Sequence, residues 1–325
     1  MNQERISSEP RTVAVVGLGL LGRGIATCFL GHGFRVIGCD HAAKSHEIAI
    51  PYIERGLREM VDHAGIEGRL LDTWRDWYHA TRGYEDWPEC DFVVESIDEE
   101  PTAKQSVFDQ VEQVVGPAVP IGSNTSAIPI TKLQEGRLHP ERLFGMHWFE
   151  PAYATRFLEI IPGEHTSDAA LATAAAVARQ CGKDPSILAK DIPGFIVNRL
   201  GYALYREALN LLELGIADAE TIDRSFRNTI GVWSTIFGPF AWIDLTGGPA
   251  LYGKAMERVL PTLSTSTELP APLRRLMEQH PQGVEASRGF HERTEQEAKQ
   301  SDELFHAHAW RASALMNEYF PMEEK

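Results

Sequence analysis

A β-branched run near the amino terminus, TVAVV, is broken by three glycines with the spacing GxGxxG. In such a unit Gly17 allows a tight turn, Gly19 lets the backbone approach a pyrophosphate, and Gly22 lets a helix pack close to its strand. The amides of Leu20 and Leu21 then lie at a helix N-terminus, which favours phosphate groups. The feature therefore predicts a β-α-β unit that holds a dinucleotide.

The surroundings of the glycines strengthen this prediction, since a bare GxGxxG is more often a structural turn. A helical segment over 20–30 ends at Gly31-His32-Gly33, and the apolar run 34–39 ends at Asp40. An acid about 20 residues after the glycines can accept hydrogen bonds from the adenosine ribose hydroxyls. Because this carboxylate would repel a 2′-phosphate, the sequence favours NAD over NADP as the cofactor.

The composition is that of a globular protein with room for two domains: 325 residues, 43% hydrophobic and 24% charged. The formal charge of −15 argues against a general nucleic-acid surface or an anionic-membrane surface. No apolar run is long enough to span a membrane, and residues 1–10 lack the apolar core of a signal peptide. Four scattered cysteines without a CxxC pair fit a reducing cytosol, so we expect a cytoplasmic protein without a disulfide framework. His306 and His308 are two residues apart and do not face each other on a helix, so we expect no metal site.

Strand-like and helix-like segments alternate through the first half of the chain, which predicts an α/β fold with a doubly wound, Rossmann-type sheet. After residue 167 the spacing becomes helical, and strand signals nearly vanish after Ile187-Leu188. Asp191-Ile192-Pro193-Gly194 separates the two regions. We therefore expect a nucleotide-binding domain over 1–190 and an all-helical domain over 191–325. The expected strands are 91–95, 118–122, 143–149 and 156–161, and the expected helices are 101–115, 168–181, 196–214, 218–230, 249–260 and a last one from about 292.

Two segments rich in apolar residues, LFGMHWFEP and FLEII, are predicted to be strands joined by a short loop. If the loop is centred near Tyr153, His147 and Glu159 lie opposite each other. A carboxylate beside an imidazole fixes the tautomer of the ring and stabilises the imidazolium, which suits a general base. A lone histidine on an apolar strand is more often a core residue, but the matched acid favours catalysis.

Two polar residues are further candidates for contacts with a substrate. Ser126 follows the strand that ends at Gly122, at the edge of the sheet where ligands bind in open α/β folds. Asn198 lies at the opening of a helix just after the domain boundary. Ser126 could equally belong to a turn or cap a short helix near Pro129. Asn198 could equally form a local bond at its helix terminus.

Together these segments resemble the L-3-hydroxyacyl-CoA dehydrogenase family, including its branches that act on free hydroxy acids such as gulonate or carnitine. The resemblance extends over nearly the whole chain, through GLGLLG, VVESIDEE, SNTS, GMHWFEP, FLEII and DIPGFIVNR. It implies an NAD-binding domain, a helical domain that forms a homodimer, and an active site between the domains. It also implies that His147 removes a proton from a secondary hydroxyl while hydride passes to NAD, with Glu159 as its partner and Ser126 and Asn198 orienting the oxygen.

The resemblance assigns cofactor contacts to Glu99 and Lys104, although an acid before a helical proline also favours the helix N-terminus. Glu150 departs from the family, which has an asparagine against the cofactor at this position. Its charge could act beside His147, meet a cationic or hydroxyl-rich substrate, or pair with Arg156, and we favour the last slightly.

The substrate suggested first is a 3-hydroxyacyl-CoA, and the alternatives are a small free 3-hydroxy acid or a non-catalytic use of NAD. Segment 41–90, where coenzyme A would be held, has ten acids and six bases, of which only Lys44 is a lysine. This balance argues modestly against a thioester. For a free acid, Arg156 or another base would hold the carboxylate.

Overall fold

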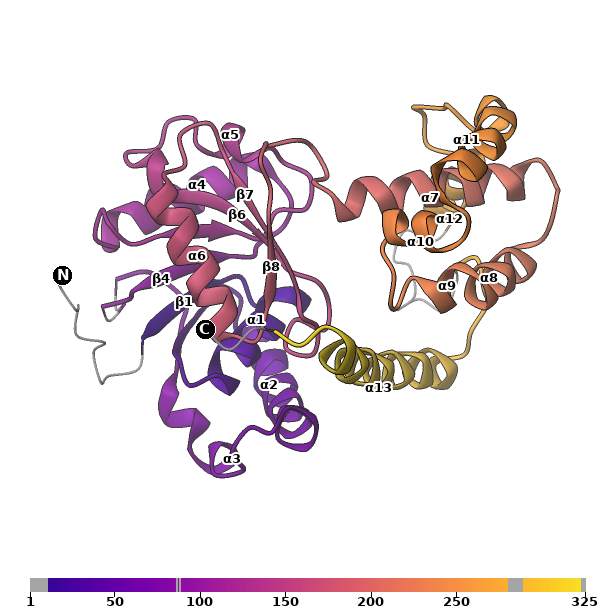
Figure 1. Cartoon of the computed structure of the whole chain (residues 1–325). Coiled ribbons are helices and arrows are strands. Elements are labelled where there is room, and N and C mark those ends of the chain that lie inside the picture. The colour runs from indigo at the N-terminus through magenta and orange to yellow at the C-terminus, as the bar shows by residue number, and fades with distance from the viewer. Residues whose placement is uncertain (1–10, 86, 88, 280–288, 323–325) are drawn as a thin grey trace. The chain divides into compact units, whose positions relative to one another are not determined.

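The computed structural model describes residues 11–85, 87, 89–279 and 289–322. The chain divides into two compact units, Met1–Phe195 and Ile196–Lys325 (Figure 1). The boundary that the sequence suggests at Asp191 lies a few residues before this division. Residues 1–10, for which we predicted no signal peptide, lie outside the described residues.

The first unit is built on one eight-stranded sheet with the order β3-β2-β1-β4-β5-β6-β7-β8. Neighbouring strands are parallel except β6 and β7, which form an antiparallel pair. The order reverses at β1, so the carboxyl ends of β1 and β4 flank the switch point where ligands bind in such sheets. The strands are β1 (Thr12–Val16), β2 (Arg35–Cys39), β3 (Tyr78–Thr81), β4 (Phe92–Glu95), β5 (Ile121–Ser123), β6 (Leu143–His147), β7 (Phe157–Pro162) and β8 (Asp184–Ile187).

Helices cover both faces of this sheet. Along β1, Val13 and Val15 alternate with Ala14 and Val16, and all four side chains are buried. Because successive strand residues point to opposite faces, both faces must be covered. The helical segments of this unit are α1 (Leu20–Gly31), α2 (Ala43–Ala64), α3 (Leu70–Thr73), η1 (Trp74–Trp77), α4 (Pro101–Val114), α5 (Ile130–Leu133), η2 (Pro140–Arg142) and α6 (Asp168–Gln180).

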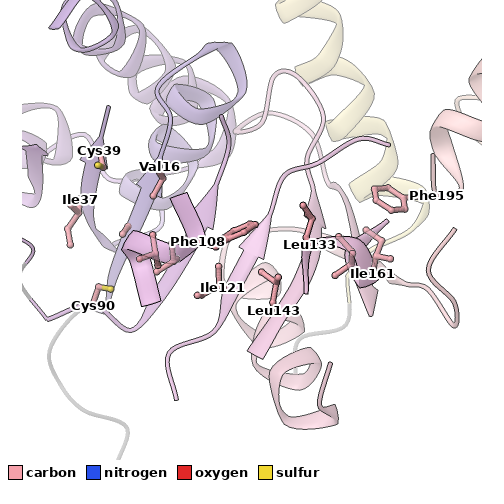
Figure 2. Close-up of a cluster of buried hydrophobic side chains, with 14 of the residues drawn as sticks. Val16, Ile37, Cys39, Cys90, Phe108, Ile121, Leu133, Leu143, Ile161 and Phe195 are labelled. Carbon is pink, nitrogen blue, oxygen red and sulfur yellow. The ribbon is translucent and has the colours of Figure 1, made fainter. Parts of the chain in front are cut away.

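One core cluster runs along the sheet from β2 to β7 (Figure 2). Val16, Ile121 and Ile161 contribute from the strands, and Phe108 and Leu133 come from α4 and α5. This packing fixes the strand ends from which the candidate site residues project.

The α/β prediction is confirmed, with shifts at particular elements. The expected strand over 118–122 begins only at Ile121, and the one over 143–149 already ends at His147. Strand β3 was missed because its sequence, YHAT, has no run of buried apolar residues. In β8, DPSI, only Ile187 is strongly apolar, and its proline is tolerated in this edge strand.

The second unit is helical, as expected, with no strand among its described residues, 196–279 and 289–322. Helices α7 to α11 have no buried residue, and Phe240 is 82% exposed. The homodimer implied by the family resemblance would cover apolar surface and stays a prediction. The helical segments are α7 (Val197–Glu213), α8 (Ala219–Asn228), α9 (Ile230–Trp233), α10 (Pro239–Leu245), α11 (Gly248–Val259), η3 (Leu260–Thr262), α12 (Ala271–Gln279) and α13 (Glu295–Tyr319).

No helix in the described ranges is both long enough and apolar enough to cross a bilayer.

Candidate active site

The glycine loop joins β1 to α1 and has the geometry that a phosphate cradle requires. Gly17 has φ +91°, and a Cβ there would meet the Ser96 carbonyl oxygen at 2.5 Å. A Cβ on Gly22 would lie only 1.8 Å from the Gly17 oxygen. At Gly19, the N-cap of α1, no atom lies within 4 Å of that position. Two glycines are thus required by backbone contacts, while the third leaves open space at the helix N-terminus, where Leu20 and Leu21 begin α1.

Asp40 lies at the end of β2 and supports this loop. Its Oδ2 accepts a hydrogen bond from the Leu18 amide at 2.9 Å, and its Oδ1 accepts one from the Ala42 amide at 2.9 Å. The carboxylate is half-buried beside the glycine turn, so the loop and the start of α2 are tied to one group. These residues fit a dinucleotide, because the turn, the open helix terminus and the acid occur together.

A second group of charges lies where β4 ends. Glu95 and Lys104 are both fully buried, with Oε1 and Nζ 2.7 Å apart. The Ser123 hydroxyl donates to Glu95 Oε2 at 2.5 Å, and the Ile97 amide donates to Oε1 at 2.8 Å. Lys104 is therefore enclosed within the protein, and the cofactor contact that the family resemblance assigns to it stays a prediction.

Glu99 connects this charged group to the SNTS segment after β5. It accepts hydrogen bonds from the Thr125 hydroxyl at 2.6 Å and from the amides of Ser126 and Ala127 at 2.8 and 2.9 Å. Partial burial alone would raise the pKa of Glu99, but these donors and the Lys104 charge outweigh it and hold the pKa below its ordinary value. Glu99 thus fixes the backbone at Ser126, which is itself half-buried.

His147 and Glu159 face each other across the β6–β7 pair, in the register that the sequence predicted. The ring Nδ1 lies 2.9 Å from Glu159 Oε2, and both side chains are almost fully buried. A carboxylate can only accept hydrogen bonds, so a contact between the Glu159 carboxylate and the neutral ring assigns the proton to Nδ1 and the lone pair to Nε2. This arrangement can take up a proton.

Aromatic side chains that the sequence analysis did not single out surround the His147 ring. Phe157 and Phe195 contact it edge-on, with ring centroids 5.9 and 5.6 Å away. Phe195 has φ +50°, an uncommon conformation for a bulky residue, and its side chain is fully buried. Such a conformation persists where the surrounding packing holds the residue in place. The preceding Pro193-Gly194, read only as a boundary, was the available signal for this turn.

Glu150 contacts α2. The Tyr52 hydroxyl donates to Glu150 Oε1 at 2.6 Å, and burial followed by the Glu150 charge raises the pKa of Tyr52, so that the phenol stays protonated. The Arg23 guanidinium lies over the Tyr52 ring, 4.8 Å from its centroid. Arg156, our favoured partner for Glu150, forms an ion pair with Asp184 of β8 at 3.0 Å. The Tyr52 contact was not predicted, because 98 residues separate the pair.

Asn198 belongs to the other unit, where it lies in the first turn of α7. The first unit therefore brings together the glycine loop, Asp40 and the two acid-linked segments around Ser126 and His147. The role expected for Asn198 stays a prediction.

Two family models match nearly all of the described chain. Residues 12–192 match the 3-hydroxyacyl-CoA dehydrogenase NAD-binding domain, and residues 194–293 match the C-terminal domain of the same family.

Two curated relatives are similar to this chain over most of its length. The chain is 34% identical over 245 residues to 5-formyl-3-hydroxy-2-methylpyridine 4-carboxylate 5-dehydrogenase of Mesorhizobium japonicum, covering 73% of this chain and 76% of the relative. It is 32% identical over 315 residues to L-carnitine dehydrogenase of Oceanobacillus iheyensis, covering 96% of this chain and all of that one.

Two solved structures have a similar fold over most of the chain. A 5-formyl-3-hydroxy-2-methylpyridine 4-carboxylic acid 5-dehydrogenase, described as an NAD⁺-dependent dismutase, superposes with a TM-score of 0.86 at 29% identity, over 97% of this chain and 100% of that one. The (S)-3-hydroxybutyryl-CoA dehydrogenase of Ralstonia eutropha gives a TM-score of 0.71 at 28% identity, over 88% and 100% of the chains.

Proposed function

The chain belongs to the 3-hydroxyacyl-CoA dehydrogenase family of NAD-dependent oxidoreductases, and from this premise we propose that it reversibly oxidises the secondary hydroxyl of a small free hydroxy acid. The observation that carries the proposal is the His147–Glu159 pair, an acid-linked imidazole enclosed by aromatic rings. The choice of a free acid over a thioester has separate support from the charges of segment 41–90.

His147 is the general base in this proposal. With the proton of Nδ1 directed to Glu159, Nε2 accepts the hydroxyl proton of the substrate. The Glu159 carboxylate then stabilises the imidazolium in a buried setting, where a charge without a partner is costly. The chemistry that bound NAD would supply is acceptance of the hydride from the carbon that carries the hydroxyl. In the reverse direction His147 returns its proton to the oxygen of the carbonyl.

The remaining site residues position the reactants. Ser126 is proposed to donate a hydrogen bond to the reacting oxygen, because Glu99 fixes its backbone at the carboxyl edge of the sheet. Asn198 is proposed to contact the same oxygen. The amides of the α1 N-terminus and Asp40 would hold the pyrophosphate and the ribose of NAD.

Most of the arginines in segment 41–90 are paired with acids, which supports a free acid as the substrate. Arg58 and Arg75 both donate to Glu54, at 2.7 and 2.8 Å, and Arg69 lies 2.5 Å from Glu67. Coenzyme A carries several phosphate charges, which need cationic partners of their own. Cations already paired with acids serve such a ligand poorly, although exposed ion pairs of this kind are weak enough to exchange. The names of the curated relatives, a carnitine dehydrogenase and a pyridine-carboxylate dehydrogenase, support the same choice.

A 3-hydroxyacyl-CoA is the second candidate substrate. The specific observation in its favour is the structural similarity to a 3-hydroxybutyryl-CoA dehydrogenase over 88% of the chain.

The test is to incubate the protein with NAD and follow NADH formation on two matched panels. One panel holds free 3-hydroxy acids, L-carnitine among them, and the other holds 3-hydroxyacyl-CoA esters. We expect turnover with free acids, and its loss in His147→Gln. Turnover confined to the CoA esters would overturn the choice of substrate, and no turnover on either panel would overturn the catalytic role itself.

A further inference from the structure

A cysteine–histidine cluster lies outside the proposed active site, at the far end of α1. Cys28 and His32 belong to the last turn and C-cap of α1, and Cys181 is the C-cap of α6. The two sulfur atoms and a ring nitrogen all lie within 4.8 Å of one another. Among the described residues, this is the only group of three histidine, cysteine or acidic side chains that converges so closely.

The local contacts show how the three side chains come together. Cys28 and His32 are four residues apart, so they share one face of the helix end. His32 Nδ1 lies 3.9 Å from Cys28 Sγ and 2.8 Å from the Cys28 carbonyl oxygen. Cys28 Sγ lies 3.7 Å from the carbonyl oxygen of Cys181. The cysteines are 153 residues apart in sequence, so no CxxC spacing could reveal the cluster.

The backbone leaves room for the imidazole. Gly182, directly after Cys181, has φ +66°, and a Cβ there would lie 3.2 Å from His32 Nε2. A larger residue would therefore press on the ring as well as strain the turn. Both cysteines are fully buried, whereas His32 is half-buried and lines a surface hollow of about 670 Å³. The cluster thus has two enclosed sulfur ligands and one histidine that connects them to solvent.

We propose that Cys28, His32 and Cys181 form a site for a thiophilic divalent cation such as Zn²⁺. Two thiolates and an imidazole are a usual zinc donor set, and a water from the hollow would complete a tetrahedron. Zinc–ligand distances of about 2.0–2.3 Å place tetrahedral donors about 3.3–3.8 Å apart, so the side chains need to close by about 1 Å. On binding, each thiol gives one proton to solvent and the two thiolates balance the cation charge.

The neighbouring charge is compatible with this ligand. Lys183 is fully buried near the cluster, but its ammonium group donates to the carbonyl oxygens of Ala152 and Thr155. Its charge is therefore directed toward those two carbonyl oxygens rather than toward the sulfur atoms. A cation at this site would tie the end of α1 to the turn before β8, and no part of the proposed dehydrogenase chemistry depends on it.

The test uses the full chain, stripped with a chelator and kept reduced with a phosphine. Zn²⁺ is titrated in competition with a chromophoric chelator, and Co²⁺ is used separately as a spectroscopic probe. We expect one Zn²⁺ per chain and a thiolate-to-Co²⁺ absorption band. His32→Ala should weaken binding at least about tenfold, and Cys28→Ala should lower the thiolate-to-Co²⁺ absorption by about half or more, because one of the two thiolates is removed.

Cys90→Ala is the matched control, since Cys90 is another buried free cysteine. It should retain full binding and the band. Circular dichroism identifies any variant that fails to fold. If a cysteine variant does not fold, His32→Ala is the deciding variant, because His32 is only half-buried. Any one of three results overturns the proposal. These are no competition for Zn²⁺ by the wild-type chain, no thiolate-to-Co²⁺ band, or Zn²⁺ binding that is weakened equally in Cys90→Ala and His32→Ala.

Discussion

Two buried pairs each include an acid from the same sheet, Glu95 with Lys104 of α4 and Glu159 with His147, and they differ in which atoms remain available for a ligand. Around Glu95–Lys104, both carboxylate oxygens accept hydrogen bonds from the protein, and the ammonium group also lies 3.3 Å from the Ile97 carbonyl oxygen. In His147–Glu159, Nδ1 of the ring contacts the acid, and in the tautomer assigned above Nε2 carries the lone pair. The first pair has its hydrogen bonds satisfied, and the second has the nitrogen that we propose as the proton acceptor.

Of the two pairs, Glu95–Lys104 has the partners of a structural pair, and His147–Glu159 has those of the proposed reactive pair. Glu95 and His147 are both the last residues of parallel strands, at the sheet edge where ligands bind. Position alone therefore does not distinguish them. What distinguishes them is the set of partners, because a fully satisfied buried pair holds a loop and has no capacity left for a substrate.

The largest expected effect is at the reactive pair. His147→Gln should lower kcat by about 10²–10⁴-fold, because it removes the proton acceptor. NAD affinity and the melting temperature should stay close to those of the wild type. Steady-state kinetics, NAD titration and thermal unfolding provide the measurements. Unchanged turnover would remove His147 from the proposed role, and an equal loss of stability would make this pair resemble Glu95–Lys104.

Breaking the Glu95–Lys104 pair should lower the free energy of unfolding. Lys104→Met leaves Glu95 as a buried charge without its cation, which costs about 3–5 kcal/mol of unfolding free energy. The control is Lys132→Met, which breaks the exposed pair with Glu135 and should cost no more than about 1 kcal/mol. Urea unfolding of the two variants measures the difference. Equal small losses would show that Lys104 has no greater structural role than a surface lysine.

A smaller effect is expected at Asp40, whose carboxylate supports the loop and is proposed to bind the ribose of NAD. Asp40→Ser removes the charge that would repel a 2′-phosphate, so the preference for NAD over NADP should fall about tenfold or more. The ratio of kcat/KM for the two cofactors measures it. A preserved ratio with lower stability would assign Asp40 to the loop alone.

The smallest effect concerns pH. Since the folded pKa of Glu99 is lowered, its carboxylate contributes stability above the unfolded pKa of about 4.3, and this contribution is lost as pH falls through the folded pKa. Glu99→Gln should therefore lose less stability than the wild type between about pH 5 and pH 3. Urea unfolding across that range is the measurement, with exposed Glu135→Gln as control. Parallel curves for wild type and Glu99→Gln would contradict the link to Ser126.

The sequence predicted those parts of the molecule that are set by local pattern. Glycine spacing marked the loop, and alternation with a short connection placed His147 opposite Glu159. Contacts between distant segments were out of its reach: the Tyr52–Glu150 hydrogen bond and the convergence of Cys28 with Cys181 follow from packing that no short-range pattern encodes. Strand β3 was missed for a related reason: it is held by its pairing with β2, which lies far away in sequence, and it has no apolar run that would mark it as a strand.

The three loop glycines also differ in what a geneticist could do with them. A side chain at Gly17 or Gly22 forces backbone atoms apart, so we expect such a variant not to fold. Gly19 has φ −60° and open space around it, so a side chain there is compatible with the fold but occupies the place where a phosphate would approach. We therefore expect Gly19→Val to separate folding from cofactor binding: the protein folds but does not bind NAD, and cells that carry it show which effects depend on the cofactor.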